Sequence, residues 1–393
     1  MNNSIKEIYD RDKTYSKKWN EQEVNVLPFS IADMEFMAPM SVIRDMTHRA
    51  RHGIYGYTLR SEGYYDAIIN WNKTRNNWEI NKEYICHSPG IVTALNLIIQ
   101  TYTSIGDGIV IQSPVYYPFI NSIKNNQRKV VFNELINDNG TYKIDYLDLE
   151  NQLKREDVKL LFFCSPHNPV GRVWNKEELI KIGNLCLKHN VLIISDEVHS
   201  DILLNGSEHN CLAKLSDDLS NNSITCMAPS KTFNLAGLQT STIIIPNNNL
   251  RRNYLKTLES LSLNKITPFG LTGVESAYKN GEDWLNDLIN KLEDNLKFIE
   301  NYLISNITDI KLIQPQGTYL AWMDCRSLGM SDKELESFML NEAKVNVRQG
   351  YQFGPGGSGF IRFNFACSKK MIKEGLQRIQ YALDLYKNKG RRK

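Results

Sequence analysis

The stretch Ile224-Thr225-Cys226-Met227-Ala228-Pro229-Ser230-Lys231 joins a short apolar run to a polar turn that ends in a lysine. An apolar run of this length, bounded by a turn, is typical of a strand buried on both faces. Burial at the end of such a strand would lower the pKa of Lys231 and make its amine a nucleophile and a base. The alternative for a lysine taken alone is an ordinary solvated surface position.

Five further apolar runs, several of them rich in β-branched residues, alternate with longer segments of helical spacing. The runs are 109–112, 129–132, 160–163, 191–194 and 241–245. Residues 93–104 and 176–189 between them carry the helical spacing. Strands that are apolar on both faces and separated by amphipathic helices indicate a mostly parallel sheet covered by helices. The sequence therefore predicts a three-layer α/β/α domain.

The pattern changes after residue 280. A long charged amphipathic segment, 284–304, is followed by strand-like pieces at 319–322 and 360–363 and by a final helical segment, 370–386. This succession is typical of a smaller α+β domain. The predicted parts are an N-terminal segment, 1–45, that packs with the small domain, a large domain, 46–280, and the small C-terminal domain, 281–393.

The composition is that of an ordinary globular protein with a substantial core. The chain has 393 residues, of which 41% are hydrophobic and 23% charged. Its formal net charge is +3, but five positive charges lie in the last seven residues, which leaves the rest near −2. Because no basic stripe interleaved with aromatic residues occurs elsewhere, nucleic acid is not an expected partner.

The cysteines and the hydropathy of the sequence indicate the cellular compartment in which the protein is expected. The seven cysteines are scattered, mostly within apolar runs, and no pair has Cys-x-x-Cys spacing. They are expected to be core residues of a protein in a reducing compartment, and no metal site is expected because the histidines form no cluster either. The polar N-terminus and the lack of an apolar run of about 18 residues indicate a cytoplasmic protein without a membrane span.

Polar residues stand at four ends of the predicted strands and helices. Ser-Pro-His-Asn-Pro-Val-Gly (165–171), Ser-Asp-Glu-Val-His (195–199) and Ala-Pro-Ser-Lys (228–231) each follow an apolar run, and His-Ser-Pro-Gly (87–90) leads into a helix. In an open parallel sheet, ligands bind beyond the carboxyl ends of the strands. These segments are therefore expected to form one site.

The order of these motifs resembles a known enzyme family. Asn-Pro-x-Gly at 168–171, Asp-x-x-His at 196–199 and Ser-Lys at 230–231 are similar to the class I/II aminotransferase family of fold-type I pyridoxal 5′-phosphate (PLP) enzymes, over nearly the whole chain. Within it, the narrower resemblance is to the cystathionine β-lyase branch, which consists of carbon–sulfur lyases. Trp19 and the runs 32–36, 55–58, 114–119, 195–199 and 231–238 carry this narrower resemblance.

The resemblance implies a role for each residue around the cofactor ring. Lys231 carries PLP as a Schiff base, and Asp196 keeps the pyridine nitrogen protonated. Asn168 donates a hydrogen bond to the phenolic oxygen, His199 replaces a tyrosine of the transaminases, and Tyr116 stacks on the ring. The simpler alternatives are a helix cap for Asp196, a turn for Asn168, and core positions for His199 and Tyr116.

The phosphate is expected at a helix start. Gly90, Ile91 and Val92 would present backbone N–H groups and the positive end of a helix dipole, and Ser230 would add a hydroxyl. The resemblance implies a homodimer in which Tyr57 reaches the phosphate of the neighbouring subunit. Two departures from the family pattern affect the phosphate site: Ala228 stands where many relatives have a serine or threonine, and Gln239 stands where aspartate-type transaminases have an arginine, which leaves the site less charged.

Arg362 is the expected ligand of the substrate. It lies inside the apolar run Phe360-Ile361-Arg362-Phe363, where a guanidinium needs an anionic partner, and its planar fork suits an α-carboxylate. An internal salt bridge is the alternative. The glycine-rich segment 354–359 lacks the strand-to-helix context of a nucleotide loop.

These expectations favour an α,β-elimination in which L-cystathionine or a related cysteine S-conjugate yields a thiol, pyruvate and ammonia. Lys231 would remove the α-proton, and Tyr57, Tyr116 or Lys231 would protonate the leaving sulfur. His199 and the flanking motifs favour a lyase over the first alternative, a PLP-dependent aminotransferase. The second alternative is a PLP-binding regulatory or interaction protein acting through a protein surface, since no helix-turn-helix segment is evident.

Overall fold

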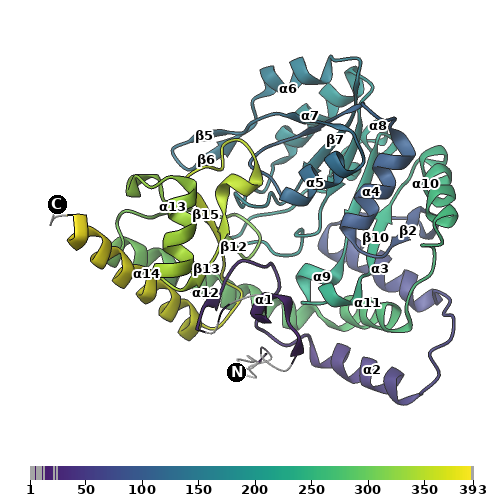
Figure 1. The fold of residues 1–393 in the computed structure, drawn as a ribbon. Helices are drawn as coiled ribbons and strands as arrows, with labels where there is room; N and C mark the ends of the chain where they lie inside the picture. The colour runs from purple at the N-terminus through teal and green to yellow at the C-terminus, as the bar shows by residue number, and fades with distance from the viewer. Residues whose placement is uncertain (1–4, 6–10, 12–13, 21–22, 24, 391–393) are drawn as a thin grey trace.

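A seven-stranded sheet forms the centre of the larger part of the molecule (Figure 1). The computed structural model describes residues 5, 11, 14–20, 23 and 25–390. The strand order is β2-β10-β9-β8-β7-β3-β4, and only β10 runs antiparallel to its neighbours. The strands are β2 Ile85–Ser88, β3 Gly108–Ile111, β4 Lys129–Phe132, β7 Val158–Cys164, β8 Leu192–Asp196, β9 Ser223–Met227 and β10 Ser241–Ile244.

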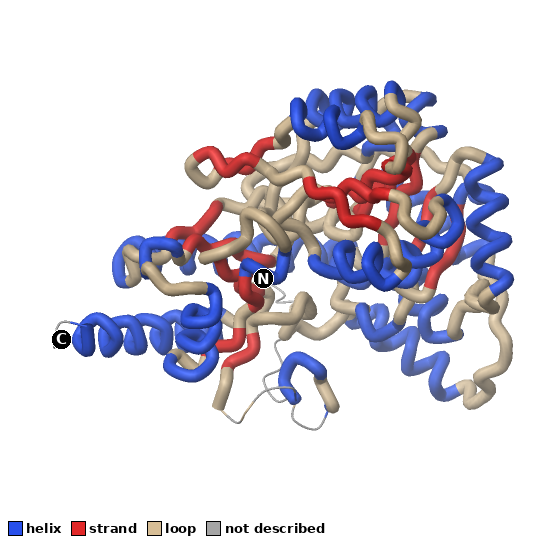
Figure 2. The backbone as a smooth tube through the Cα atoms, turned by 45° about the horizontal axis from the view of Figure 1, so that its top comes forward, coloured by secondary structure: helices blue, strands red, loops and turns tan. Residues whose placement is uncertain are grey.

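Helices cover both faces of this sheet (Figure 2). Leu161 and Phe163 of β7 pack into the same cluster as Leu179 of α7, whereas the alternate residues Leu160 and Phe162 pack into another cluster with residues of α4 and α10. Because side chains alternate between the faces of a strand, these two clusters are the two sides of one sheet. The helices of this part are α2 Met40–Arg51, α3 Glu62–Arg75, α4 Ile91–Tyr102, α5 Tyr117–Asn125, α6 Tyr146–Leu153, α7 Lys176–Lys188, α8 Asp217–Asn221, α9 Pro229–Thr232, α10 Asn248–Ser260 and α11 Pro268–Asn280.

A second, antiparallel sheet follows in the sequence, with the strand order β11-β12-β15-β14. Its elements are β11 Lys311–Ile313, β12 Leu320–Asp324, β14 Arg348–Gln349 and β15 Phe360–Asn364, with helices α12 Glu282–Asn306, α13 Asp332–Ser337 and α14 Lys369–Gly390. Near the N-terminus, β1 (Leu27–Pro28) pairs with β13 (Val345–Asn346) in parallel, and β5 (Ile136–Asp138) and β6 (Thr141–Lys143) form a hairpin; α1 is Lys17–Asn20. The domain boundaries at residues 45 and 280 stay predictions.

The three-layer α/β/α architecture expected from the sequence is confirmed, and each of the six apolar runs is a strand of the large sheet. Strand β2 had not been expected, because Ile85-Cys86-His87-Ser88 contains only two apolar residues. The antiparallel direction of β10 was also not foreseen. A run that is apolar on both faces indicates a buried strand, but it does not indicate whether that strand runs parallel or antiparallel to its neighbours.

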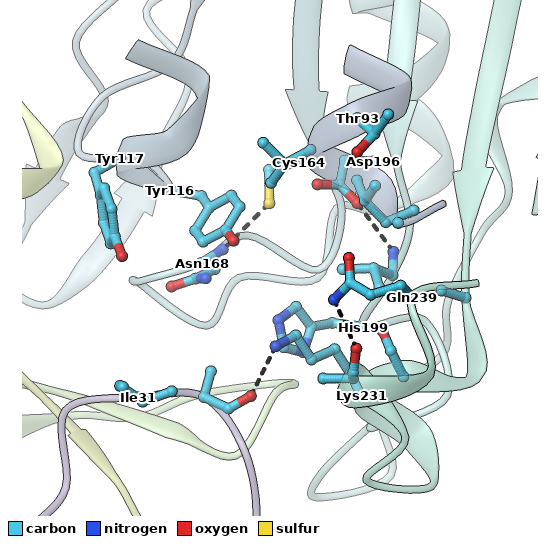
Figure 3. Close-up of a pocket in the computed structure, with 18 of the residues that line it drawn as sticks. Ile31, Thr93, Tyr116, Tyr117, Cys164, Asn168, Asp196, His199, Lys231 and Gln239 are labelled. Carbon is cyan, nitrogen blue, oxygen red and sulfur yellow. Dashed lines mark hydrogen bonds between the residues drawn. The ribbon is translucent and has the colours of Figure 1, made fainter. Parts of the chain in front are cut away.

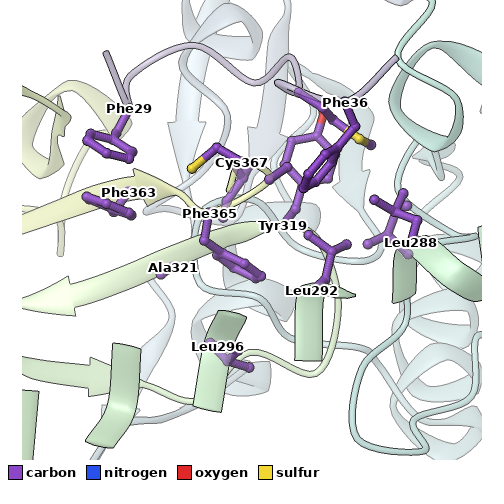
Figure 4. Packing of buried hydrophobic residues seen from close by; sticks show 14 of the residues in the cluster. Phe29, Phe36, Leu288, Leu292, Leu296, Tyr319, Ala321, Phe363, Phe365 and Cys367 are labelled. Atoms are coloured by element: carbon purple, nitrogen blue, oxygen red, sulfur yellow. The ribbon is translucent and has the colours of Figure 1, made fainter. Parts of the chain in front are cut away.

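Helix α12 packs a leucine stripe against the second sheet (Figure 4). Leu288, Leu292 and Leu296 recur at the four-residue spacing that places side chains on one helix face, and all three are buried. Across from them, Phe363 of β15 stacks on Phe29 with ring centroids 4.0 Å apart. The segment before α2 is therefore part of the core beneath the second sheet.

All seven cysteines are buried and form no disulfide, in agreement with their expected role as core residues. Within the described part of the chain, no helix has both the length and the apolar character that a membrane span requires.

Shortening Leu292 to alanine is expected to reduce the free energy of unfolding by about 2–5 kcal/mol, because the side chain is fully buried and leaves a cavity. Urea denaturation of both proteins measures the difference. Asn301→Ala, an exposed change on the same helix, is the control and should alter the free energy by about 0.5 kcal/mol or less. Equal effects of the two changes would contradict the packing described for α12.

Candidate functional site

A cavity of about 300 Å³ opens at the carboxyl ends of β7, β8 and β9 (Figure 3). Asn168 follows β7, Asp196 is the last residue of β8, and Lys231 follows β9 on the short helix α9. The cavity brings together ten of the residues predicted from the sequence. They are Gly90, Ile91, Val92, Tyr116, Asn168, Asp196, His199, Ser230, Lys231 and Arg362.

Lys231 extends its amine toward the N-terminal segment. Its Nζ donates a hydrogen bond to the carbonyl oxygen of Ala32 at 2.7 Å. Burial, followed by repulsion from Arg362, lowers the pKa of Lys231 to about 8, although the nearby carboxylates of Asp33 and Asp196 act in the opposite direction. The unprotonated amine is therefore far more populated near neutral pH than in an ordinary lysine, which favours its action as a nucleophile or general base.

Asp196 is a buried carboxylate without a cationic partner. Only 2% of the residue is exposed, and its Oδ1 accepts a hydrogen bond from the backbone N–H of Val198 at 3.2 Å. Among the described residues, no lysine, arginine or histidine nitrogen lies within salt-bridge distance of it. Burial consequently raises the pKa of Asp196 to about 7. A cationic N–H group placed beside it would restore the ionised form.

Arg362 on β15 reaches the cavity from the second sheet. Its Nη1 donates to Oδ1 of Asn168 at 3.0 Å and its Nη2 to the carbonyl oxygen of Ser30 at 2.8 Å, while its buried Nε has no hydrogen-bond partner in the described part of the chain. Burial, then repulsion by Arg348, lowers the pKa of Arg362 to about 10. Because no carboxylate of the described residues pairs with it, the alternative of an internal salt bridge is wrong. The site has an unmatched positive charge.

His199 and Tyr116 are neutral side chains of the cavity wall. The ring of His199 lies edge-on to Tyr319 at 5.8 Å, and its buried Nδ1 has no hydrogen-bond partner. Burial, with repulsion from Lys231 and Arg362, holds the pKa of His199 well below its ordinary value. Burial raises the pKa of the Tyr116 hydroxyl, which therefore keeps its proton. Both groups present hydrogen-bonding atoms to the cavity without adding charge.

The start of helix α4 supplies N–H groups, but not all of those expected. Gly90 has the left-handed φ of 92°, and its own N–H donates to Ser88 at 2.8 Å, so the prediction of a free donor at Gly90 is wrong. Gly90 instead contributes the backbone turn that leads into α4. The N–H groups of Ile91, Val92 and Thr93 belong to the first helical turn and have no helical acceptor. Thr93 also lines the cavity and was missed.

Tyr57 lies outside the cavity of its own chain. It is 95% exposed, and Nζ of Lys265 lies 4.8 Å from the centre of its ring. A contribution of Tyr57 to a neighbouring subunit stays a prediction.

The N-terminal segment closes one side of the cavity, which the sequence reading had missed. Ser30 and Ala32 accept hydrogen bonds from Arg362 and Lys231, as described above, and Asn364 donates to the carbonyl oxygen of Ile31 at 2.7 Å. The buried amine of Lys18 anchors the segment at 2.8 Å from Oε1 of Glu35. Most of these contacts are made by backbone carbonyl oxygens. Because every residue has one, the residue types in this segment do not predict that it closes the cavity.

The residues that line the cavity match the functional groups of PLP one by one. The unpaired carboxylate of Asp196 matches the protonated pyridine nitrogen, and the Nδ2 group of Asn168 is left to donate because its Oδ1 faces Arg362. The first turn of α4 matches a phosphate, and the amine of Lys231 matches an aldehyde carbon.

Comparison with known proteins gives consistent matches over nearly the whole chain. The model of the family described as "Aminotransferase class I and II" matches residues 24–379. Cystathionine beta-lyase PatB of Bacillus subtilis is 42% identical over 379 residues, which cover 95% of this chain and 98% of PatB.

Two solved structures have the same fold, each with a TM-score of 0.94. Cystalysin of Treponema denticola, which contains PLP, is 38% identical and the match covers 97% of this chain and 98% of cystalysin. A PLP-bound chain of Clostridium difficile 630, provisionally described as an aminotransferase, is 44% identical, with 96% of this chain and 98% of that chain covered.

In the cofactor-free protein, acetylation of Lys231 is expected to rise with pH around a midpoint of about 8, because burial and Arg362 lower the pKa of its amine from the ordinary 10.5. Mass spectrometry of the Lys231 peptide after brief labelling with acetic anhydride measures this midpoint. Arg362→Gln should move it upward by removing a repulsive charge, and Asp196→Asn should move it downward. A midpoint near 10.5 would contradict the environment described for Lys231.

Proposed function

The chain belongs to the aminotransferase class I and II family, and we propose that it cleaves the carbon–sulfur bond of L-cystathionine or related cysteine S-conjugates. It is a PLP-dependent carbon–sulfur lyase, and its products by α,β-elimination are a thiol, pyruvate and ammonia. The observation that carries this proposal is the convergence of Lys231, Asp196 and Arg362 on one cavity in a chain so similar to a cystathionine β-lyase.

Substrate binding falls to Arg362 and its neighbours. The substrate's α-carboxylate takes the place of the missing anion at the guanidinium, whose Nε has no hydrogen-bond partner among the residues that the structure describes. Asn168 and the carbonyl oxygen of Ser30 hold the other two guanidinium nitrogens and fix the plane of the fork. This binding places the Cα–H bond of the substrate inside the cavity, next to Lys231.

Removal of the α-proton falls to Lys231. Its lowered pKa leaves the amine able to accept a proton near neutral pH. When bound, the cofactor supplies the electron sink for the negative charge that develops at Cα. Asp196 holds the proton on the pyridine nitrogen, because burial makes a cationic N–H the partner that its carboxylate lacks. Tyr116 and His199, which line the cavity, would contact the bound cofactor and help to hold it.

Elimination then breaks the Cβ–S bond, and the bonding pair leaves with the sulfur. The thiolate takes a proton from Lys231, which has just accepted one, or from the hydroxyl of Tyr116, which burial keeps protonated. Tyr57 of a neighbouring subunit is the third candidate donor.

Incubation of the holoenzyme with L-cystathionine is expected to yield pyruvate and homocysteine in equal amounts without any added 2-oxo acid, because elimination needs no amino acceptor. Coupled assay of pyruvate and thiol detection measure both products. Strict dependence on a 2-oxo acid would instead make the protein an aminotransferase, the function for which the Clostridium difficile chain is described.

Lys231→Ala should lower kcat by about 10²–10⁴-fold, because it removes the proposed general base. Lys373→Ala, an exposed lysine of α14 outside the cavity, is the matched control and should keep kcat within about twofold. An alanine variant at Lys231 that retains full turnover would contradict the proposed mechanism.

We also propose that the enzyme is a cytoplasmic homodimer in which Tyr57 completes the neighbouring site. Its free, buried cysteines suit a reducing compartment, and the near-complete exposure of Tyr57 leaves it available to a second copy. Light scattering should give twice the chain mass, and Tyr57→Phe should weaken cofactor binding without dissociating the dimer. A fully active monomer would contradict this arrangement.

A further inference from the structure

A second arginine, Arg348, lines the same cavity as Arg362. The two residues are direct partners in the register of β14 and β15. Directly opposed residues on antiparallel strands project from the same face of the sheet, with Cβ atoms about 5 Å apart. Both side chains therefore extend from adjacent positions toward the cavity that also contains Lys231.

This arrangement is electrostatically unfavourable for the protein alone. Like charges that lie directly opposite on neighbouring strands repel each other. Among the described residues, no carboxylate lies within salt-bridge distance of either guanidinium. Among these residues, the one hydrogen bond of the Arg348 guanidinium is a long one from Nη1 to Oε1 of Gln352, at 3.5 Å, and its buried Nε has no hydrogen-bond partner. After burial, repulsion by Arg348 is the next cause of the lowered pKa of Arg362.

Aromatic rings hold the two guanidinium groups at separate positions. The Cζ atom of Arg362 lies 5.1 Å from the ring centre of Phe353, and that of Arg348 lies 5.2 Å from the ring centre of Tyr117. The two rings meet edge to face, with centroids 6.1 Å apart. Each cation is therefore supported on its own ring. One carboxylate bound at Arg362 leaves the charge of Arg348 unmatched.

We propose that Arg348 binds a second carboxylate, carried by the sulfur substituent of the substrate, while Arg362 binds the α-carboxylate. The preferred substrates are then cysteine S-conjugates with an anionic leaving group. This inference rests on the proposed carbon–sulfur lyase function and adds the charge of the leaving group to it.

The test compares two substrates that differ in that charge. S-carboxymethyl-L-cysteine and S-carbamoylmethyl-L-cysteine have nearly the same size, but only the first carries a second carboxylate. With the holoenzyme, kcat/KM for pyruvate formation is expected to be about tenfold or more higher for the carboxymethyl substrate, since a charge-assisted hydrogen bond is at stake. Arg348→Gln should bring the ratio close to one by lowering kcat/KM for the carboxymethyl substrate. Arg348→Lys should restore part of the ratio.

Arg326→Gln is the matched control, because it removes the same charge from an exposed arginine outside the cavity and should preserve the ratio. Equilibrium binding to the holoenzyme provides a readout independent of turnover. The unaltered protein should bind glutarate about tenfold or more tightly than it binds the monoamide of glutarate. The Arg348→Gln variant should bind the two compounds equally tightly.

The outcomes distinguish a failure of this inference from a failure of the proposed lyase function. If the unaltered enzyme forms pyruvate from both substrates at equal rates, or if Arg348→Gln lowers both rates by the same factor, the inference is overturned and the lyase function stands. If neither these substrates nor L-cystathionine yields pyruvate, the proposed function fails first, whatever the dicarboxylate binding shows.

Discussion

The parallel alignment of β7, β8 and β9 is the constraint on which the site depends. Its register places Cys164, Asp196 and Cys226 side by side at the carboxyl end of three buried strands. Asn168 and Lys231 follow a few residues beyond the ends of the outer two strands. Three groups separated by up to 63 positions in the sequence therefore face one cavity. The hydrophobic packing of both sheet faces keeps this edge fixed, because a shift in register would carry every buried side chain out of place.

Burial without counter-charges sets the chemistry of the cavity. Lys231 and Arg362 donate to backbone carbonyl oxygens of the segment around Ser30 and Ala32, and no carboxylate in the described part of the chain pairs with Arg362. This arrangement lowers the pKa of Lys231 and leaves a net attraction for anions. A polypeptide segment that contributes carbonyl oxygens can satisfy hydrogen-bond donors without cancelling their charge. The N-terminal segment thus closes the site and preserves its affinity for carboxylates.

Much of the candidate site could be predicted because its chemistry depends on polar residues in unusual positions. Asn168, Asp196 and Lys231 are polar residues at the ends of apolar runs, a position where a side chain without a function would be costly. Gly90 was placed in the site, but its N–H was wrongly assigned as free, since only the turn geometry shows that Ser88 accepts it. Arg348 escaped notice because Val-Asn-Val-Arg-Gln gives no sign that its arginine lies opposite Arg362 across two strands.

The sequence alone determined the three-layer α/β/α architecture, the family resemblance and the prediction that Lys231 binds the cofactor. Each depends on local composition: alternating apolar runs, helical spacing and the residues that end the strands. Only the tertiary structure decided that β10 runs antiparallel, that the segment around Ser30 closes the cavity, and that two arginines share one wall. These features arise from pairings between distant segments, and the direction and register of such pairings depend on the packing of the whole chain rather than on any short stretch of it.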